Sequence, residues 1–148
     1  MRLRPLFLAL FPFALAACGD SSTATTAVPI ESTAFAPSLG VNLAASTKTP
    51  SGLYFRDIRV GTGATLANGT KVTAKYSGAL ANGTVFDAGT FPFTLGAGAV
   101  IRGWDEGLVG MKVGGSRQLI IPPELGYGST GSGPIPPNAV LVFTVEPQ

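Results

Sequence analysis

The 148-residue chain contains no histidine and only one cysteine, Cys18. The absence of histidine removes the commonest general base and the commonest metal ligand in proteins. A single cysteine cannot form an internal disulfide bond or a thiolate metal site. Catalysis by a Ser-His-Asp arrangement is therefore excluded, and we expect neither a metal nor a cofactor.

Charge is also scarce, at 12% of residues, with ten Lys and Arg against eight Asp and Glu. Arg2 and Arg4 lie in a segment that we expect to be removed, which leaves eight charges of each sign. Nucleic-acid binding requires a basic surface, so we expect no nucleic-acid partner. The 20 glycines and 12 prolines argue against a helical protein and favour short strands joined by turns. The length allows one domain and a tail.

Residues 1–17 have the pattern of a secretory signal peptide. Arg2 and Arg4 supply positive charge, an apolar core runs from Leu6 to Leu15, and small residues follow. The uncharged stretch is shorter than the ~20 residues that span a bilayer. A buried N-terminal helix is the alternative, but Pro12 would break it.

The next four residues, Leu15-Ala16-Ala17-Cys18, resemble the bacterial lipoprotein box. The resemblance implies that Cys18 is acylated, becomes the mature N-terminus and anchors the protein in a membrane. Gly19 follows Cys18, which by the same resemblance favours the outer membrane of the bacterial cell envelope, facing the periplasm. The alternative is an incidental cysteine inside a signal peptide.

Residues 18–48 are rich in Ser, Thr, Ala and Pro and show no clear periodicity. This composition predicts a flexible, lipidated tether. The alternative is a strand or short helix docked on the domain, for which Phe35 and Val41–Leu43 are the candidates. Residues 49–148 are expected to form the domain.

Within the domain, β composition and turn residues predict four main strands: Leu53–Val60, Lys71–Leu80, Ser116–Ile121 and Ala139–Glu146. Asn82-Gly83 follows the second strand, and Asn-Gly is a strong hairpin signal because both residues accept positive φ. Lys71–Leu80 should therefore pair antiparallel with Thr84–Asp87. The apolar run in Ala139–Glu146 predicts a position near the middle of the sheet.

The stretch Phe91–Gly110 holds the only tryptophan, Trp104, and the only helix-like apolar pattern. We predict a short helix over Arg102–Val109, with Gly110 as its C-terminal stop. A sheet wrapped around one short helix would place Trp104 either in the core or at the floor of a pocket.

Seven blocks then carry a family resemblance: Tyr76–Gly78, Gly83–Asp87, Phe91–Gly96, Val100–Gly107, Ile121–Pro123, Tyr127-Gly128 and Ile135–Asn138. Their order and spacing resemble those of FKBP-type peptidyl-prolyl cis-trans isomerases over residues 50–147. The resemblance implies an α+β fold, in which a curved antiparallel sheet of five or six strands wraps around one short helix. The proline pocket would lie between the sheet and the helix.

Carried over motif by motif, the resemblance implies three catalytic residues, Asp87, Tyr127 and Ile101. It implies seven substrate-binding residues: Tyr76, Phe86, Phe91, Val100, Trp104, Ile135 and Phe143. Trp104 would be the floor and the phenylalanines the walls, while Tyr127 and the N–H of Ile101 would bond substrate carbonyls. This sequence departs from the family pattern in two places. The loop before Ile135 is one residue shorter than in familiar members, and Gly126 stands where a small side chain is common. Both departures bear on substrate preference.

The implied reaction agrees with the missing residue types. Rotation about an X–Pro bond crosses a barrier of ~20 kcal/mol set by amide resonance, and no bond breaks. An apolar pocket can favour the twisted amide over the planar one without a nucleophile, metal or cofactor. We therefore expect an isomerase that assists the folding of exported proteins.

Two alternatives remain. One is a proline-peptide or unfolded-chain binding module with little catalysis, and the other is a structural cell-surface β domain. The expected partners are proline-containing polypeptides, and the resemblance adds tacrolimus or rapamycin as ligands. The chain has no long helical arm of the kind that dimerises some exported relatives, so we expect a monomer.

Overall fold

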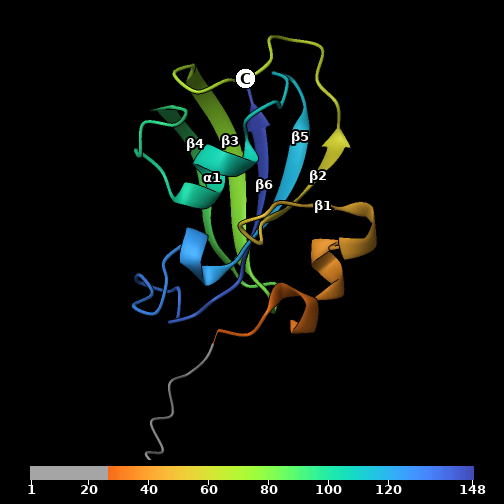
Figure 1. Cartoon of the computed structure of the whole chain (residues 1–148), viewed down its shortest axis with the longest axis vertical. Helices are drawn as coiled ribbons and strands as arrows, with labels where there is room; N and C mark the ends of the chain where they lie inside the picture. The colour runs from red at the N-terminus through yellow and green to blue at the C-terminus, as the bar shows by residue number, and fades with distance from the viewer. Residues whose placement is uncertain (1–26) are drawn as a thin grey trace, which may run out of the picture.

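The computed structural model describes residues 27–148, and the predicted signal segment and Cys18 lie outside this range. The described strands are β1 Thr47–Lys48, β2 Tyr54–Arg59, β3 Lys71–Leu80, β4 Val85–Thr94, β5 Ser116–Ile121 and β6 Leu141–Pro147 (Figure 1). The described helices are α1 Arg102–Gly107 and four 3₁₀ helices, η1 Ile30–Ser32, η2 Pro37–Leu39, η3 Leu43–Ala45 and η4 Pro123–Leu125. In this part of the chain, no helix has the length and apolar character needed to cross a membrane.

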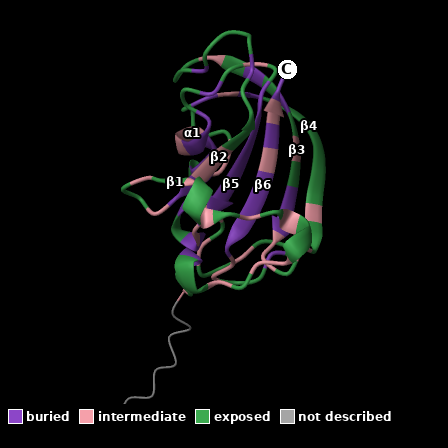
Figure 2. Ribbon diagram, turned by 90° about the vertical axis from the view of Figure 1, so that its right-hand side faces the viewer, coloured by how far each residue is buried: buried purple, intermediate pink, exposed green. Residues whose placement is uncertain are grey.

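The six strands form one antiparallel sheet in the order β1-β2-β5-β6-β3-β4. The sheet curves around α1, which lies on its concave face (Figure 1). The predicted α+β architecture, with a curved sheet around one short helix, is confirmed. β6 lies between β5 and β3, as its apolar run predicts, and Figure 2 shows that β5 and β6 are largely buried.

The core fills the space between α1 and the concave face. On β3, Val72 and Ala74 are buried, while Lys71, Thr73 and Lys75 alternate with them and are exposed. This alternation is the period of two that the sequence predicts for a half-buried strand. The side chains on the concave face of β3 therefore face the helix.

Two predicted strands, β3 and β5, have the bounds that the sequence indicates, but the helix is shorter than predicted. α1 ends at Gly107, not Val109, and Gly110 lies beyond it in a left-handed conformation with φ +82°. The Arg117 guanidinium donates to the carbonyl of Gly107 at 2.9 Å and to that of Val109 at 3.4 Å. A side chain from β5 thus satisfies helix-terminal carbonyls, which have no partner within the helix.

β4 is longer than the predicted Thr84–Asp87 and continues to Thr94. It takes in Phe91–Phe93, which the sequence analysis grouped with the helical stretch. β4 pairs with β3 as far as Lys71↔Thr94, and this pairing holds the segment extended. Pro92 is tolerated because β4 is an edge strand, where a missing N–H need not break a ladder bond.

Residues 30–48, here called the strap, pack against the convex face of the sheet (Figure 1, orange to yellow). Ile30 is 4% exposed and belongs to a second apolar cluster that includes Ile120 and Val142. The Gln118 side-chain amide donates to the carbonyl of Leu39 at 2.7 Å. The strap is therefore a docked element, the alternative that the sequence left open for this part of the expected tether.

Glu31, near the start of the strap, contacts Lys48 at the end of the strap and Tyr54 on β2. Glu31 accepts hydrogen bonds from Lys48 Nζ at 2.5 Å and from the Tyr54 hydroxyl at 2.6 Å. These bonds, first the one from Lys48 and then the one from Tyr54, lower the pKa of Glu31 to about 2. The same contact raises the pKa values of Lys48 and Tyr54.

Candidate active site

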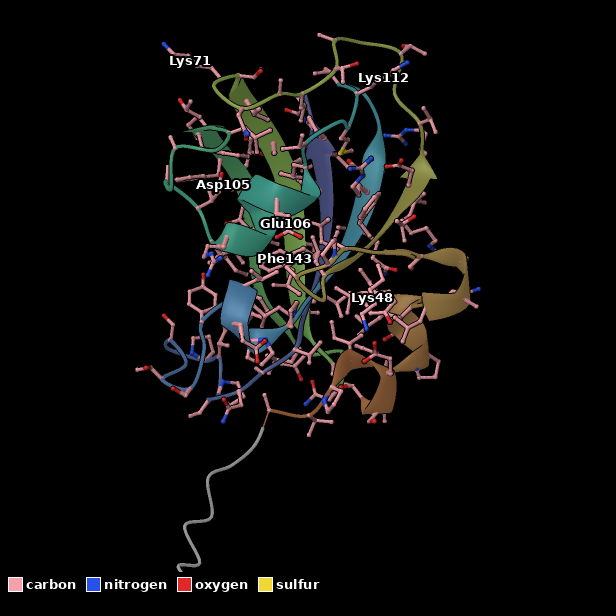
Figure 3. All side chains as sticks on the ribbon, in the orientation of Figure 1. Lys48, Lys71, Asp105, Glu106, Lys112 and Phe143 are labelled. Atoms are coloured by element: carbon pink, nitrogen blue, oxygen red, sulfur yellow. The ribbon has the colours of Figure 1, made fainter. Side chains whose placement is uncertain are left out.

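A cavity of about 220 Å³ opens between α1 and the concave face of the sheet. Its lining residues are mostly aromatic or aliphatic: Tyr76, Phe86, Asp87, Phe91, Ala99, Val100, Ile101, Trp104, Tyr127 and Phe143. They come from β3, β4, β6, α1 and two loops, and Phe143 lies on the side of β6 that faces α1 (Figure 3). The fold thus brings together nine of the ten residues that the sequence analysis assigned to the pocket, with Ala99 as an addition.

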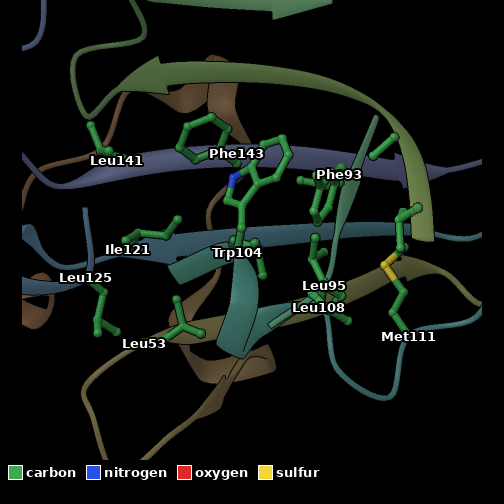
Figure 4. Close-up of a cluster of buried hydrophobic side chains, with 14 of the residues drawn as sticks. Leu53, Phe93, Leu95, Trp104, Leu108, Met111, Ile121, Leu125, Leu141 and Phe143 are labelled. Atoms are coloured by element: carbon green, nitrogen blue, oxygen red, sulfur yellow. The ribbon is translucent and has the colours of Figure 1, made fainter. Parts of the chain in front are cut away.

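Trp104 lies at the bottom of this cavity and is 4% exposed. Its indole packs edge-on against Tyr76, with ring centroids 5.2 Å apart. It packs edge-on against Phe143 as well, with ring centroids 5.4 Å apart (Figure 4). Gly103 makes this position possible, because a Cβ there would lie 2.7 Å from the Ile121 side chain of β5. The helix can therefore approach the sheet closely enough to seat the indole between the aromatic rings.

Phe86 and Phe143 form one wall, with ring centroids 5.5 Å apart and nearly perpendicular planes. Gly78 lies beneath them, and a Cβ there would come within 2.5 Å of the Phe143 ring. Phe91 stands at the mouth, where it stacks on Phe93 and remains 44% exposed. The cavity is thus packed at its base and open at its rim.

A polar pair interrupts the aromatic lining. The Tyr76 hydroxyl donates to Asp87 Oδ2 at 2.7 Å. This hydrogen bond is the main cause that raises the pKa of Tyr76, followed by partial burial and the charge of Asp87. The phenol therefore stays protonated across the neutral range and holds the carboxylate at the rim.

Two further donors belong to the cavity lining. Among residues 27–148, the backbone N–H of Ile101 has no backbone acceptor, while its carbonyl accepts from the N–H of Trp104 at 3.0 Å. Tyr127 follows η4 in the chain and is 37% exposed. Both groups can bond a ligand carbonyl, which is the role that the sequence analysis expected of them.

Asp105 supports the site in a way that the sequence analysis missed. Its carboxylate accepts from the N–H of Gly96 at 2.8 Å and from that of Gly98 at 3.1 Å. Both glycines have positive φ, so they form a tight turn that leads to Val100. Figure 3 shows Asp105 on α1. Asp105 is not among the site residues that the sequence predicts, and only the fold shows that its carboxylate reaches this turn.

Ile135 lies elsewhere. It is 6% exposed, belongs to the main core cluster and is not part of the cavity wall. Its N–H and C=O pair with Ser132 at 2.9 and 3.0 Å, which closes the loop that precedes it. Ile135 therefore supports the loop beyond Tyr127 from within the core. Over residues 27–148, no cluster of His, Cys, Asp or Glu could hold a metal ion.

A curved antiparallel sheet around a short helix, with an aromatic cavity between them, defines an FKBP-like class of fold. The solved structure of AtFKBP13 matches with a TM-score of 0.65 and 42% identity, covering 69% of this chain and 95% of that one. FkpA from Escherichia coli matches with a TM-score of 0.65 and 38% identity, covering 70% and 50%.

The sequence comparisons are consistent with this class. A Rhizopus delemar protein named FK506-binding protein 4 is 51% identical over 105 residues, which are 68% of this chain and 28% of that protein. The Neisseria meningitidis serogroup B FK506-binding protein is 48% identical over 101 residues, 64% of this chain and 93% of that one. The family model of FKBP-type peptidyl-prolyl cis-trans isomerases matches residues 63–147, and the chain belongs to this family.

Proposed function

We propose that this protein is a peptidyl-prolyl cis-trans isomerase. The observation that carries the proposal is the aromatic cavity over Trp104, whose lining is mostly aromatic or aliphatic and has a single charged residue, Asp87. The planar X–Pro amide is stabilised by resonance, and its twisted form has lost that resonance and part of its dipole. A site that is less polar than bulk water stabilises the twisted amide relative to the planar amide.

Each lining residue then has a role. The proline ring rests on Trp104, with Phe86 and Phe143 beside it. The N–H of Ile101 and the hydroxyl of Tyr127 donate to carbonyls of the bound peptide and fix its position. A donor that bonds more strongly as the amide twists lowers the barrier. Asp87 orients Tyr76 and sets a negative charge at the rim.

The alternative is a module that binds proline peptides or unfolded chains with little turnover. The exposed rings of Phe91 and Tyr127 at the mouth favour binding in either case. The deciding experiment measures isomerisation of a proline tetrapeptide by the full chain, beside capture of an unfolded, proline-free polypeptide. Turnover of the tetrapeptide supports the isomerase. Capture of the unfolded polypeptide without turnover of the tetrapeptide supports the binding module. The absence of both activities would favour the structural surface domain.

We propose that the enzyme works on exported proteins, as a lipid-anchored monomer on the periplasmic side of the outer membrane. The support comes from the signal-like residues 1–17 and from the Leu-Ala-Ala-Cys box that ends at Cys18. Acyl chains contribute ~0.8 kcal/mol per buried methylene, so two or more chains on Cys18 give a stable anchor.

We further propose that tacrolimus or rapamycin binds the cavity. Because Trp104 is the only tryptophan, ligand contact should change the intrinsic fluorescence of the protein. The measurement is a fluorescence titration, with inhibition of isomerisation followed in parallel. A ligand that inhibits without any spectral change would show that it binds away from Trp104.

A further inference from the structure

β4 forms an open edge of the sheet. It pairs with β3 on one side, and nothing in residues 27–148 pairs with its other side. Most of β4 is exposed, and Figure 2 shows it as a long exposed ribbon at the border of the sheet. Such an edge presents unpaired N–H and C=O groups to any extended chain.

The register shows which backbone groups face outward. Leu95, directly after β4, donates its N–H to Thr70 at 2.9 Å, and its C=O accepts from Gly69 at 2.8 Å. Both groups of Leu95 therefore point toward the β3 side. In an antiparallel ladder this direction alternates from residue to residue. The N–H and C=O groups of Thr90 and Ala88 consequently point away from β3.

A second observation gives the same direction. Gln148 donates its N–H to the carbonyl of Thr73 at 2.8 Å, on the side of β3 away from β4. Thr73 pairs with Pro92, so that pair exchanges no hydrogen bond and Pro92 faces outward. Because the direction alternates along β4, the residues two and four positions before Pro92, Thr90 and Ala88, also have backbone N–H and C=O groups that point away from β3. No hydrogen bond from these groups to residues 27–148 is present.

This edge is continuous with the cavity. Asp87 and Phe91 line the cavity, and Gly89 lies between them on the same face, opposite Tyr76. Gly89 has no side chain, and the only atoms within 4 Å of a Cβ placed there would belong to Tyr76, with its hydroxyl oxygen at 3.9 Å and its ring at 4.0 Å. Between Asp87 and Phe91 the wall of the cavity therefore carries no side chain, a position here called the gap, and it lies beside the outward backbone groups of Ala88 and Thr90.

We infer that the free edge of β4 between Asp87 and Phe91 binds the extended polypeptide beside the proline as an added strand. The inference rests on the proposed function, in which the cavity holds the proline. An extended chain that leaves the cavity through the gap at Gly89 meets two N–H donors and two C=O acceptors at strand spacing. Backbone pairing recognises any extended sequence, so the partner is an unfolded or extended segment.

Edge protection is weak here. Edge strands are commonly protected by lysines, prolines or inward charges. β4 contains no lysine, and its only proline, Pro92, lies beyond the part that flanks the gap. Its only charged residue, Asp87, is engaged by Tyr76 at 2.7 Å. The segment from Ala88 to Thr90 therefore remains available to a partner.

The test compares a tetrapeptide with a twelve-residue peptide that has the same four residues at its centre. Thr90→Pro removes the outward N–H of Thr90 but no ladder bond, so the sheet should keep its fold, as it does at Pro92. The ratio of kcat/KM for the long peptide to that for the short one should fall about three- to tenfold. Thr90→Val keeps the N–H and is the matched control, in which the ratio should be retained.

A second experiment uses a twelve-residue peptide that is N-methylated on the backbone of the residues flanking the X–Pro dipeptide. With the wild-type full chain, this peptide should lose the same advantage over the tetrapeptide. An unchanged ratio in Thr90→Pro would overturn the inference while leaving the proposed function intact. A concentration-dependent dimer that Thr90→Pro abolishes would also overturn it, because a second copy would then occupy the edge.

Failure of the proposed function is seen separately, as absence of turnover on both peptides. In that case fluorescence anisotropy of the labelled long peptide still tests the edge. Binding that is several-fold weaker in Thr90→Pro than in Thr90→Val supports the inference, and equal binding overturns it.

Discussion

The hydrogen bond from Tyr76 to Asp87 places a carboxylate at the rim of an otherwise aromatic cavity. The two residues lie on neighbouring strands, and Gly89 and Gly78 pair with them across the ladder. Because both glycines lack side chains, nothing stands between the phenol and the carboxylate. The pair therefore follows from register rather than from a local motif.

Asp87→Ala should reduce kcat/KM about tenfold, which corresponds to ~1.4 kcal/mol of transition-state stabilisation. The same change should lower the pKa of Tyr76 toward its ordinary ~10, because its main hydrogen-bond acceptor is lost. Tyr127→Phe removes a proposed carbonyl donor and should reduce kcat/KM by a similar factor. Proline-peptide isomerisation and a spectrophotometric tyrosine titration measure these effects. An Asp87→Ala protein that unfolds, or that isomerises normally, would refute the proposed role.

Phe143 should matter for stability more than Phe91 does. Phe143 is 4% exposed and contacts the rings of Tyr76, Phe86 and Trp104. Phe143→Ala should lower the free energy of unfolding by ~3–5 kcal/mol, a large share of the stability of a small domain. Phe91→Ala, at an exposed position, is the matched control and should cost less. Urea denaturation of both variants decides, and equal losses would contradict the prediction.

At the scale of the elements, Arg117 ties α1 to the sheet. Its guanidinium makes two bonds to Asp57, at 2.7 and 3.0 Å, and one to the carbonyl of Gly107 at 2.9 Å. It also lies 4.6 Å from the centre of the Phe55 ring. A planar fork with several donors suits this position better than an ammonium would. The C-terminal end of α1 is thus fixed, while its N-terminal end carries Trp104.

The ion pair of the strap should make the free energy of unfolding depend on pH in the acidic range. The pKa of Glu31 falls from 4.5 to about 2 in the folded protein, because Lys48 and Tyr54 donate to its carboxylate. A lowered folded-state pKa adds stability that is present above pH 4.5 and is lost as the pH falls toward 2. Glu31→Gln should therefore flatten the decline in unfolding free energy over this range.

The measurement is the denaturation midpoint as a function of pH for the wild type and Glu31→Gln. Glu124→Gln serves as the control, because no hydrogen bond or ion pair of that carboxylate to residues 27–148 is present. Its pH dependence should match that of the wild type. Identical profiles for Glu31→Gln and the wild type would show that the strap contact contributes nothing in solution.

For the whole molecule, the proposed acylation of Cys18 would let the docked strap limit the distance between the domain and a membrane. Eleven residues separate Cys18 from Ile30, the first residue of the strap. At ~3.3–3.6 Å per extended residue, they span at most ~40 Å. If the strap did not dock, the chain between Cys18 and the domain would be longer, because it would include the residues up to Lys48. An anchored enzyme with a docked strap therefore works close to the membrane surface.

Cys18→Ser should release the protein from the membrane, because it removes the proposed site of acylation. The check is fractionation of cells that express the wild type or the variant, together with labelling by a radioactive fatty acid. The wild type should carry label and sediment with membranes, and the variant should do neither. A variant that stays in the membrane fraction, or a wild type without label, would refute the anchor.

Local patterns in the sequence determined much of this protein. The bounds of β3 and β5, the Asn-Gly turn before β4 and the central place of β6 follow from alternation, turn chemistry and apolar runs, which act within a few residues. Spaced motifs also indicated nine residues that line the cavity. Each of these signals is contained in a short stretch of chain.

Only the tertiary structure decided the remaining features. The full length of β4 depends on pairing with β3, and the docking of the strap depends on an apolar convex face built by β5 and β6. The reach of Asp105 to Gly96 and the burial of Ile135 in the core depend on how the chain folds back on itself. Contacts between residues far apart in sequence leave no periodic signal near either partner, so the free energy that selects them exists only once the sheet has formed.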